Sequence, residues 1–312
     1  MRRLLSLLVI LLLFVQTIRA LEKRTYAYVQ RDSLTLYMDH YISSITKEQR
    51  PAILFVFGGG FASGRRDSAN YIPYFRFLVK NGYDVFSIDY RLGMKDVGKR
   101  SIFSYISLYN RTINNAAEDL LSAAAYIIEN SQELGIDSKR IFASGSSAGA
   151  ITCLQAEHRL INRKAITSLP ENFNFKGIIS FAGAIFSLHG RPGWKSEPCP
   201  VMFFHGDADS NVPYRKAAIL GIGMFGPEIL IKKWQRTGAS VYFHTGKYRT
   251  HKLATEPMTK NQPEILNFLT MVDKDFKFNI HNVIWDPAYE KCNTRFSLRD
   301  FLSHDYSQTD DR

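Results

Sequence analysis

The sequence predicts an α/β fold, with helices on both faces of a mostly parallel sheet. Several short apolar runs, among them Ala52 to Phe57 and Val201 to Phe204, are continuous rather than alternating, which is typical of strands covered on both sides. Stretches with helical periodicity separate these runs, and such alternation indicates parallel strands joined by helices. The chain has 312 residues, 45% of them apolar, without an internal repeat or a Pro/Gly/Ser-rich linker. We therefore expect one large domain with a substantial core.

The expected elements follow in order from residue 21. Tyr26 to Gln30 and Leu34 to Asp39 alternate around a short polar turn, which predicts an antiparallel hairpin. Further strands are expected at Ala52 to Phe57, Asp84 to Ile88, Arg140 to Ala143, Gly177 to Phe181, Val201 to Phe204 and Ser240 to His244. Helices are expected at Tyr71 to Asn81, Asn115 to Glu133, from about Ala148, at Glu228 to Arg236 and at Gln262 to Phe276. No clean periodicity follows, so we interpret 21–276 as the domain and 277–312 as a C-terminal extension.

Residues 1–20 have the layout of a secretory signal peptide. Arg2 and Arg3 precede an apolar run from Leu4 to Val15, and Ala20 is a small residue before the expected cleavage point. The run is shorter than the roughly 20 apolar residues that a membrane-spanning helix needs. We therefore expect an exported protein, periplasmic or secreted, whose mature chain is not stably inserted in a membrane. An uncleaved anchor is the alternative.

The net charge is basic. It is +11 for the whole chain and +8 without residues 1–20, which contain three arginines. Such a surplus favours anionic surfaces or acidic polymers, although it is also found in ordinary basic exported proteins. The lysines and arginines are scattered and form no run with interleaved aromatic residues, so we expect no nucleic-acid partner.

The cysteines are Cys153, Cys199 and Cys292. Cys153 follows the serine motif described next and is expected on a packed helix face. In an oxidising compartment, Cys199 and Cys292 are then the two that could form a disulfide, and the sequence leaves open whether they do. No spacing of Cys and His resembles a zinc site, so we predict neither a metal ion nor another cofactor.

The most specific motif is Gly145-Ser146-Ser147-Ala148-Gly149, between a predicted strand and a predicted helix. In that context the glycines permit the tight turn that raises a central serine hydroxyl above the sheet. The first turn of the helix also directs free backbone N–H groups towards developing negative charge. A plain Gly/Ser turn is the alternative, but the position between strand and helix favours Ser147 as a nucleophile.

A second motif, Phe57-Gly58-Gly59-Gly60-Phe61, follows a buried strand. Acyl transfer creates an oxyanion that requires preorganised N–H donors. We expect one donor at the backbone of Ala148 and the other at Gly59 or Gly60, where no side chain hinders the approach of the backbone. A flexible turn would also be rich in glycine, but the serine motif favours the oxyanion-hole interpretation.

A carboxylate is expected after the strand Val201 to Phe204. The chain continues there as His205-Gly206-Asp207-Ala208-Asp209, and we select Asp209 to orient a histidine, with Asp207 in reserve. Asp207 is the residue better placed to brace the turn. His205 precedes the loop and is expected to be structural.

The base should follow the acid, in the chain order Ser, Asp, His. The histidines beyond Asp209 are His244, His251, His281 and His304. His251 lies in the loop between the last predicted strand and the closing helix, and such loops meet at the carboxyl edge of a parallel sheet. We therefore select His251, because His244 ends a strand and the other two lie in the tail.

Together these motifs resemble those of α/β-hydrolase esterases, particularly exported bacterial carboxylesterases and carbohydrate-esterase-like proteins. The resemblance extends from Tyr26 to Phe276 and also rests on Asp89-Tyr90-Arg91-Leu92 and Gly135-Ile136-Asp137. It implies the α/β-hydrolase fold with an eight-stranded, mostly parallel sheet, and a serine esterase that works through an acyl-enzyme. Phe57 is a departure, because many relatives have at this position a histidine that supports the glycine loop.

The substrate is less defined than the chemistry. Export favours small-molecule or polysaccharide-linked esters, for example acetyl or feruloyl groups. Trp194, in the segment from Ile185 to Pro198, is expected either near the pocket or in ordinary loop packing. A peptidase of the same fold and an inactive binding protein on the same scaffold are the alternatives. The intact serine, acid and histidine candidates favour an enzyme.

Overall fold

A computed structural model describes residues 21–45, 48–95, 97–98, 100–162 and 169–296. The expected signal peptide and His304 lie outside this part of the chain. The main strands are β1 (Lys23–Arg31), β2 (Leu34–Tyr41), β3 (Arg50–Val56), β4 (Asp84–Ile88), β5 (Ile136–Ser146), β6 (Ile178–Phe181), β8 (Val201–Gly206), β11 (Val241–Gly246) and β12 (Asn279–Ile284). They form a nine-stranded sheet in the order β1-β2-β4-β3-β5-β6-β8-β11-β12.

This sheet has the predicted mostly parallel arrangement. The hairpin of β1 and β2 is antiparallel, β2 also pairs with β4 in the antiparallel direction, and every pair from β4 to β12 is parallel. Eight of the strands belong to 21–276, as expected, and β12 adds a ninth from the extension. The extension is thus joined to the sheet, because β12 pairs along its length with β11.

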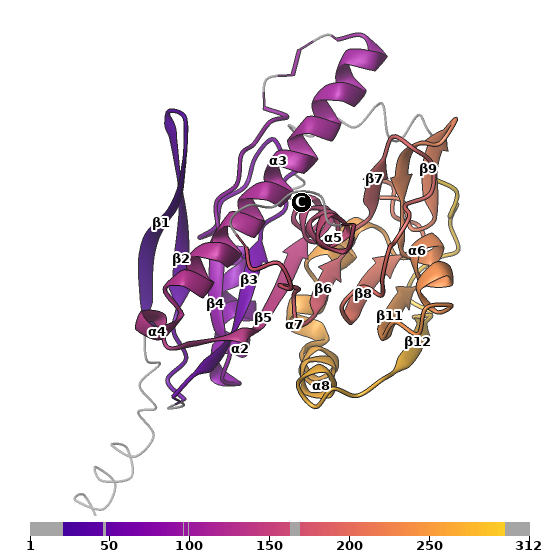
Figure 1. The fold of residues 1–312 in the computed structure, drawn as a ribbon. Coiled ribbons are helices and arrows are strands. Elements are labelled where there is room, and N and C mark those ends of the chain that lie inside the picture. Colours follow the sequence, from indigo (N-terminus) through magenta and orange to yellow (C-terminus); the bar gives the residue numbers. More distant parts are fainter. Residues whose placement is uncertain (1–20, 46–47, 96, 99, 163–168, 297–312) are drawn as a thin grey trace, which may run out of the picture.

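Helices cover both faces of the sheet (Figure 1). They are α2 (Ile72–Lys80), α3 (Ile102–Glu129), α4 (Ser131–Leu134), α5 (Ala148–Ile161), α6 (Pro227–Trp234), α7 (Pro257–Lys260) and α8 (Gln262–Asp273), with 3-10 turns η1 (Ala69–Tyr71) and η2 (His251–Ala254). α3 packs against α5 on one face, and α2 and α8 both contact α7 on the other. None of the helices in the described part combines the length and apolar character needed to cross a membrane.

The position of α3 corrects the sequence prediction. The helix was expected to begin at Asn115, but it begins at Ile102, where the Ser101 side chain accepts a hydrogen bond from the backbone N–H of Ser104 at 3.3 Å. The added turns contain aromatic and β-branched residues, which have lower helix propensity and hide a helical pattern. The capping serine offsets that preference.

A small antiparallel sheet was not predicted. It consists of β7 (Ile185–Ser187), β10 (Ile222–Phe225) and β9 (Lys216–Ile219), in that order. β9 and β10 form a hairpin whose turn residues Leu220 and Gly221 both have positive φ values, 48° and 85°. This geometry suits the right-handed twist of the strands.

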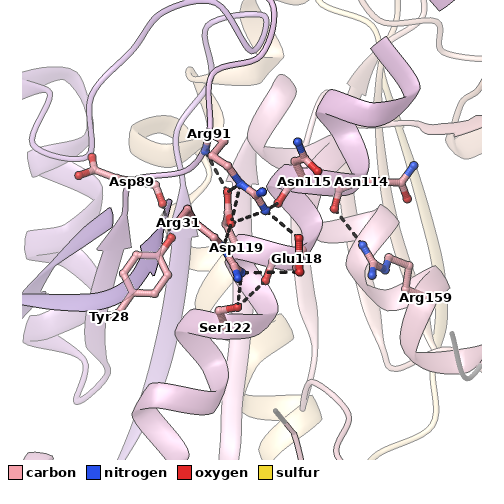
Figure 2. Close-up of polar contacts among 10 residues, drawn as sticks. All are labelled: Tyr28, Arg31, Asp89, Arg91, Asn114, Asn115, Glu118, Asp119, Ser122 and Arg159. Carbon is pink, nitrogen blue, oxygen red and sulfur yellow. Dashed lines mark hydrogen bonds and ion pairs between the residues drawn. The ribbon is translucent and has the colours of Figure 1, made fainter. Parts of the chain in front are cut away.

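Ion pairs fix the loop after β4 to α3 and β1 (Figure 2). Asp119 on α3 is fully buried and binds the guanidinium of Arg91 through both carboxylate oxygens, at 3.0 and 2.9 Å from Nε. Arg31 of β1 donates to the same carboxylate at 3.1 Å. Tyr28 donates its hydroxyl hydrogen to the carbonyl oxygen of Asp89 at 2.6 Å. A buried carboxylate is stable only when paired in this way, so this network holds the loop Asp89–Arg91 in place.

All three cysteines are free thiols. Cys153 is buried on α5, as expected, and Cys199 is also buried, whereas Cys292 is exposed. Cys199 and Cys292 are therefore not paired in this structure.

Candidate active site

Ser147 occupies the sharp turn between β5 and α5. Its φ is 52° and its ψ is −115°, a conformation that costs free energy for a residue with a β-carbon. The two glycines of the motif are required because a side chain at either position would clash with the neighbouring backbone. A Cβ at Gly145 would lie 2.4 Å from the backbone of Gly149, and one at Gly149 would lie 2.0 Å from the carbonyl oxygen of Val56. The turn therefore packs directly onto the end of β3.

The structure brings the three predicted residues of a triad together. His251 Nε2 lies 2.8 Å from Ser147 Oγ, and His251 Nδ1 lies 2.8 Å from Asp209 Oδ2. Ser147 follows β5, Asp209 lies in the loop after β8, and His251 begins η2 after β11. Because these strands are parallel, their carboxyl ends meet at one edge of the sheet, and this explains how three distant segments converge.

The surroundings of Asp209 favour its ionised form. It is 3% exposed, and its Oδ1 accepts hydrogen bonds from the backbone N–H groups of Asn211 at 2.8 Å and Val212 at 2.9 Å. Burial by itself raises the pKa of this carboxyl, but the charge and hydrogen bond of His251, with smaller contributions from His205 and Val212, hold the pKa below its ordinary value. The carboxylate can thus accept the Nδ1–H of His251 and fix its tautomer.

The other candidate residues have different partners. Asp207 binds the ammonium of Lys247 and accepts from the backbone N–H of Tyr248 at 2.6 Å, so it braces the turn after β11. His205 is fully buried and donates to the carbonyl oxygen of Val212 at 3.0 Å, and burial lowers its pKa. His244 contacts Glu264, and His281 contacts Thr245, each at 3.0 Å.

The glycine loop lies beside Ser147. A Cβ at Gly58 would be 3.4 Å from the Ser147 Cβ, and Gly59 and Gly60 have φ values of 122° and 60°. In the described part of the chain, the backbone N–H groups of Gly59, Gly60 and Ala148 donate to no other backbone group. These N–H groups are therefore free to donate to an oxyanion.

Phe57 supports the glycine loop by packing. Its ring is 2% exposed and lies against the ring of Tyr90, with the centroids 4.5 Å apart. The Tyr90 hydroxyl donates to the Phe57 carbonyl oxygen at 3.0 Å, and the backbone N–H of Gly58 donates to the Tyr71 hydroxyl at 3.1 Å. Tyr90 lies between Asp89 and Arg91, the loop residues whose contacts Figure 2 shows, and its bond to Phe57 connects that loop to the glycine loop.

Sequence reasoning missed one positioning contact. The hydroxyl of Ser146 donates to the carbonyl oxygen of Ala254 at 2.8 Å, which ties the serine turn to η2, the turn that begins with His251. The sequence offered no signal for it, because the partner is a backbone atom more than 100 residues away.

Trp194 does not lie at the site. Its ring packs edge-on against Trp234 and His158, with centroid distances of 5.0 Å in both cases. His158 is eleven residues after Ser147 along α5, about 16 Å at the helical rise. Trp194 therefore has the role of an ordinary loop-packing residue. Phe186, from the same segment, lies closer to the glycine loop, because its ring contacts Tyr109, which in turn contacts Phe61.

The arrangement places a serine hydroxyl, a histidine and a carboxylate in one hydrogen-bonded series, beside the N–H groups at the start of α5. These are the parts that acyl transfer requires. Among the described residues, no group of His, Cys, Asp and Glu side chains is arranged to hold a metal ion.

Comparisons with known proteins find partial similarity to a lipase and to esterases. The family model described as BD-FAE matches residues 38–186, just under half of the chain. Lipase 2 of Moraxella sp. (strain TA144) is 33% identical over 105 residues, which is 34% of this chain and 20% of that protein. The fumonisin B1 esterase of Sphingopyxis macrogoltabida is 30% identical over 102 residues, 32% of this chain and 18% of that protein. The matched segments thus span about a fifth of these relatives.

Solved structures resemble almost the whole domain. Thermogutta terrifontis esterase 2 in its propionate-bound form has a TM-score of 0.59 at 20% identity, covering 83% of this chain and 94% of that one. The same esterase phosphorylated by paraoxon has a TM-score of 0.56 at 19% identity, covering 81% and 92%. Likeness at this identity shows the fold. The α/β-hydrolase fold is thus confirmed, and so is the resemblance to the esterases that have it.

Proposed function

We propose that this α/β hydrolase cleaves carboxylic esters through an acyl-enzyme formed on Ser147. The observation that supports this most directly is the continuous hydrogen-bonded series from Ser147 Oγ to His251 Nε2 and from His251 Nδ1 to Asp209 Oδ2, each step 2.8 Å. Asp209 and Ser147 lie 42 and 104 residues from His251 in the sequence, so local chain geometry alone does not produce this series of hydrogen bonds.

In the first half of the reaction, Ser147 attacks the ester carbonyl. Asp209 holds the Nδ1–H of His251, which leaves Nε2 free to accept the Ser147 proton. The tetrahedral oxyanion is bound by the N–H of Ala148 and by that of Gly59 or Gly60. The protonated His251 then gives its proton to the leaving alcohol.

In the second half, water enters where the alcohol left. His251 removes a proton from that water, the hydroxide attacks the acyl-enzyme and Ser147 recovers its proton as the acid departs. The positive φ of Ser147 keeps its hydroxyl above the sheet in both halves. No step requires a cofactor.

The proposed substrates are short-chain or carbohydrate-linked esters, such as acetyl or feruloyl esters, met outside the cytoplasm. The names of the relatives support an ester, since they are a lipase and an esterase. The solved neighbours include forms of the Thermogutta enzyme with propionate and butyrate bound, which are short acids. Export rests on the layout of residues 1–20.

The test is hydrolysis of a p-nitrophenyl ester series from acetate to long acyl chains, with the Ser147→Ala variant alongside. We expect activity on the short chains that falls to the uncatalysed level in the variant. Near-wild-type activity in Ser147→Ala would exclude Ser147 as the nucleophile. A folded wild-type protein that is inactive across the series would favour the peptidase or the inactive binding protein instead.

A further inference from the structure

The beginning of α3 and the β9–β10 hairpin project from the same end of the molecule (Figure 1). The first projection begins at Ile102, and the turn of the second is at Leu220 and Gly221. Both lie at the carboxyl edge of the sheet. The helix α3 begins after the end of β4, and the hairpin strand β10 pairs with β7, which follows the end of β6. α5, which begins directly after Ser147, contacts α3 and β7. The candidate active site therefore lies at the same edge of the sheet as the two projections.

Both projections end in exposed apolar side chains. Leu220 is 99% exposed and Phe103 is 81% exposed, the two highest values among the large apolar residues of the described part. Their neighbours Ile219 and Ile102 are also exposed. Apolar surface in water is unfavourable in proportion to its area, so two such tips on one side of the molecule indicate a surface that covers them.

The charges near the tips have one sign. The stretches 97–117, 186–196 and 210–227 contain no Asp or Glu. The backbone N–H of Gly190 donates to the carbonyl oxygen of Gly221 at 2.9 Å, which places Arg191 next to the hairpin turn. The exposed cations nearest the tips are Arg100, three residues before Phe103, and Arg191 beside the hairpin turn.

We propose that this face docks on an anionic lipid surface, with Phe103 and Leu220 in the interface and Arg100 and Arg191 against the headgroups. Apolar tips next to cations match the two layers that such a surface presents. An acidic polysaccharide would match the cations but leave both tips in water. A second copy of the chain would bring the same cations together. Docking turns Ser147 towards the surface, so under the proposed function it favours esters held there.

The test is co-sedimentation of the full chain with vesicles of phosphatidylcholine alone and of phosphatidylcholine mixed with phosphatidylglycerol. We expect binding to the mixed vesicles only, weakened by salt. The Phe103→Ser/Leu220→Ser variant should bind about tenfold more weakly because it lacks the apolar contacts. The Arg100→Glu/Arg191→Glu variant should lose about tenfold or more because it repels the headgroups.

Matched controls are Phe276→Ser and Lys139→Glu. Phe276 is 55% exposed, and both residues line a groove near the opposite edge, where β5 begins. Both controls, and Ser147→Ala, should bind like the wild type, and since binding needs no turnover, its failure is distinct from failure of the proposed esterase. Residues 1–20 are present in every variant. Three results would each overturn the proposal: no binding to mixed vesicles, equal binding to both vesicle types, or tip and cation variants that bind as well as the controls.

Discussion

Ser147 has a φ of 52°, which a residue with a side chain adopts only where its surroundings impose it. Two hydrogen bonds hold the Ser147 backbone in this conformation: its N–H donates to the carbonyl oxygen of Phe181 at 2.8 Å, and its carbonyl oxygen accepts from the N–H of Ile151 at 2.9 Å. The hydroxyl is then left facing His251. At this scale the motif predicted from sequence and the observed geometry agree.

The two aspartates after β8 provide a matched pair for testing the acid. Asp209→Asn presents an amide to His251 and should favour the wrong tautomer, so kcat should fall by roughly 10³- to 10⁴-fold with little change in KM. Asp207→Asn alters only the contacts to Lys247 and Tyr248. It should lower the melting temperature and leave kcat within about threefold of wild type.

The measurement is steady-state kinetics on a short-chain p-nitrophenyl ester, with thermal unfolding of both variants. A large loss of kcat in Asp207→Asn together with an active Asp209→Asn would reverse the assignment of the acid.

At the scale of elements, α5 meets β3 so closely that only glycine fits between them. Gly149→Ala would place a methyl group 2.0 Å from the carbonyl oxygen of Val56, so the helix or the strand must shift. We expect a loss of about 2 kcal/mol or more in unfolding free energy, together with reduced activity, because the same shift displaces Ser147.

The control for that substitution is Gly193→Ala. A Cβ there would have no atom within 4 Å and the φ is not positive, so the free energy of unfolding should be unchanged or slightly higher. Urea unfolding of both variants is the measurement. Equal free energies of unfolding for Gly149→Ala and Gly193→Ala would contradict the expectation.

The elements that were predicted correctly are those whose apolar pattern in the sequence indicates burial. β3 and β8 contain continuous apolar runs, and β4 is mostly apolar; in the structure all three are buried along almost their whole length. β9 and β10 were missed because each is four residues long and half of β9 is exposed. β12 was missed for a related reason: none of its residues is buried, and apolar and polar residues do not alternate along its sequence Asn-Ile-His-Asn-Val-Ile.

The site was predictable to a similar degree. The serine turn, the glycine loop and the two loops that hold Asp209 and His251 each follow a strand, and their convergence follows from parallel topology. Contacts such as Ser146 to Ala254 and Tyr90 to Phe57 depend on how the loops fold back, for which a single sequence has no periodic signal.

For the whole molecule, one buried carboxyl links stability to pH. Glu157 on α5 is fully buried and accepts hydrogen bonds from the backbone N–H of Cys199 at 2.7 Å and from Asn174 at 3.2 Å. Burial raises its pKa to about 7, because these bonds only partly offset the lost hydration. The folded state therefore keeps a proton that the unfolded chain releases near pH 4.5.

It follows that the free energy of unfolding decreases as the pH rises from about 4.5 to about 7, by up to about 3 kcal/mol from this group. Glu157→Gln keeps the acceptor oxygen without the charge, so it should match wild type at pH 5 and exceed it at pH 8. Glu129→Gln, an exposed position on α3, should follow wild type at both. Urea unfolding at the two pH values is the measurement, and a Glu157→Gln variant that loses stability with pH as wild type does would rule this linkage out.

The central claim is that Ser147 is the activated nucleophile, and covalent labelling tests it most directly. Paraoxon, the reagent that phosphorylated the Thermogutta esterase, should add one phosphoryl group to this chain, located by peptide mass spectrometry on the peptide with Ser147. Labelling should be absent in Ser147→Ala and strongly slowed in His251→Ala, because only a serine with a base reacts readily. A label on another residue, or a folded wild-type protein that takes up none, would contradict the account.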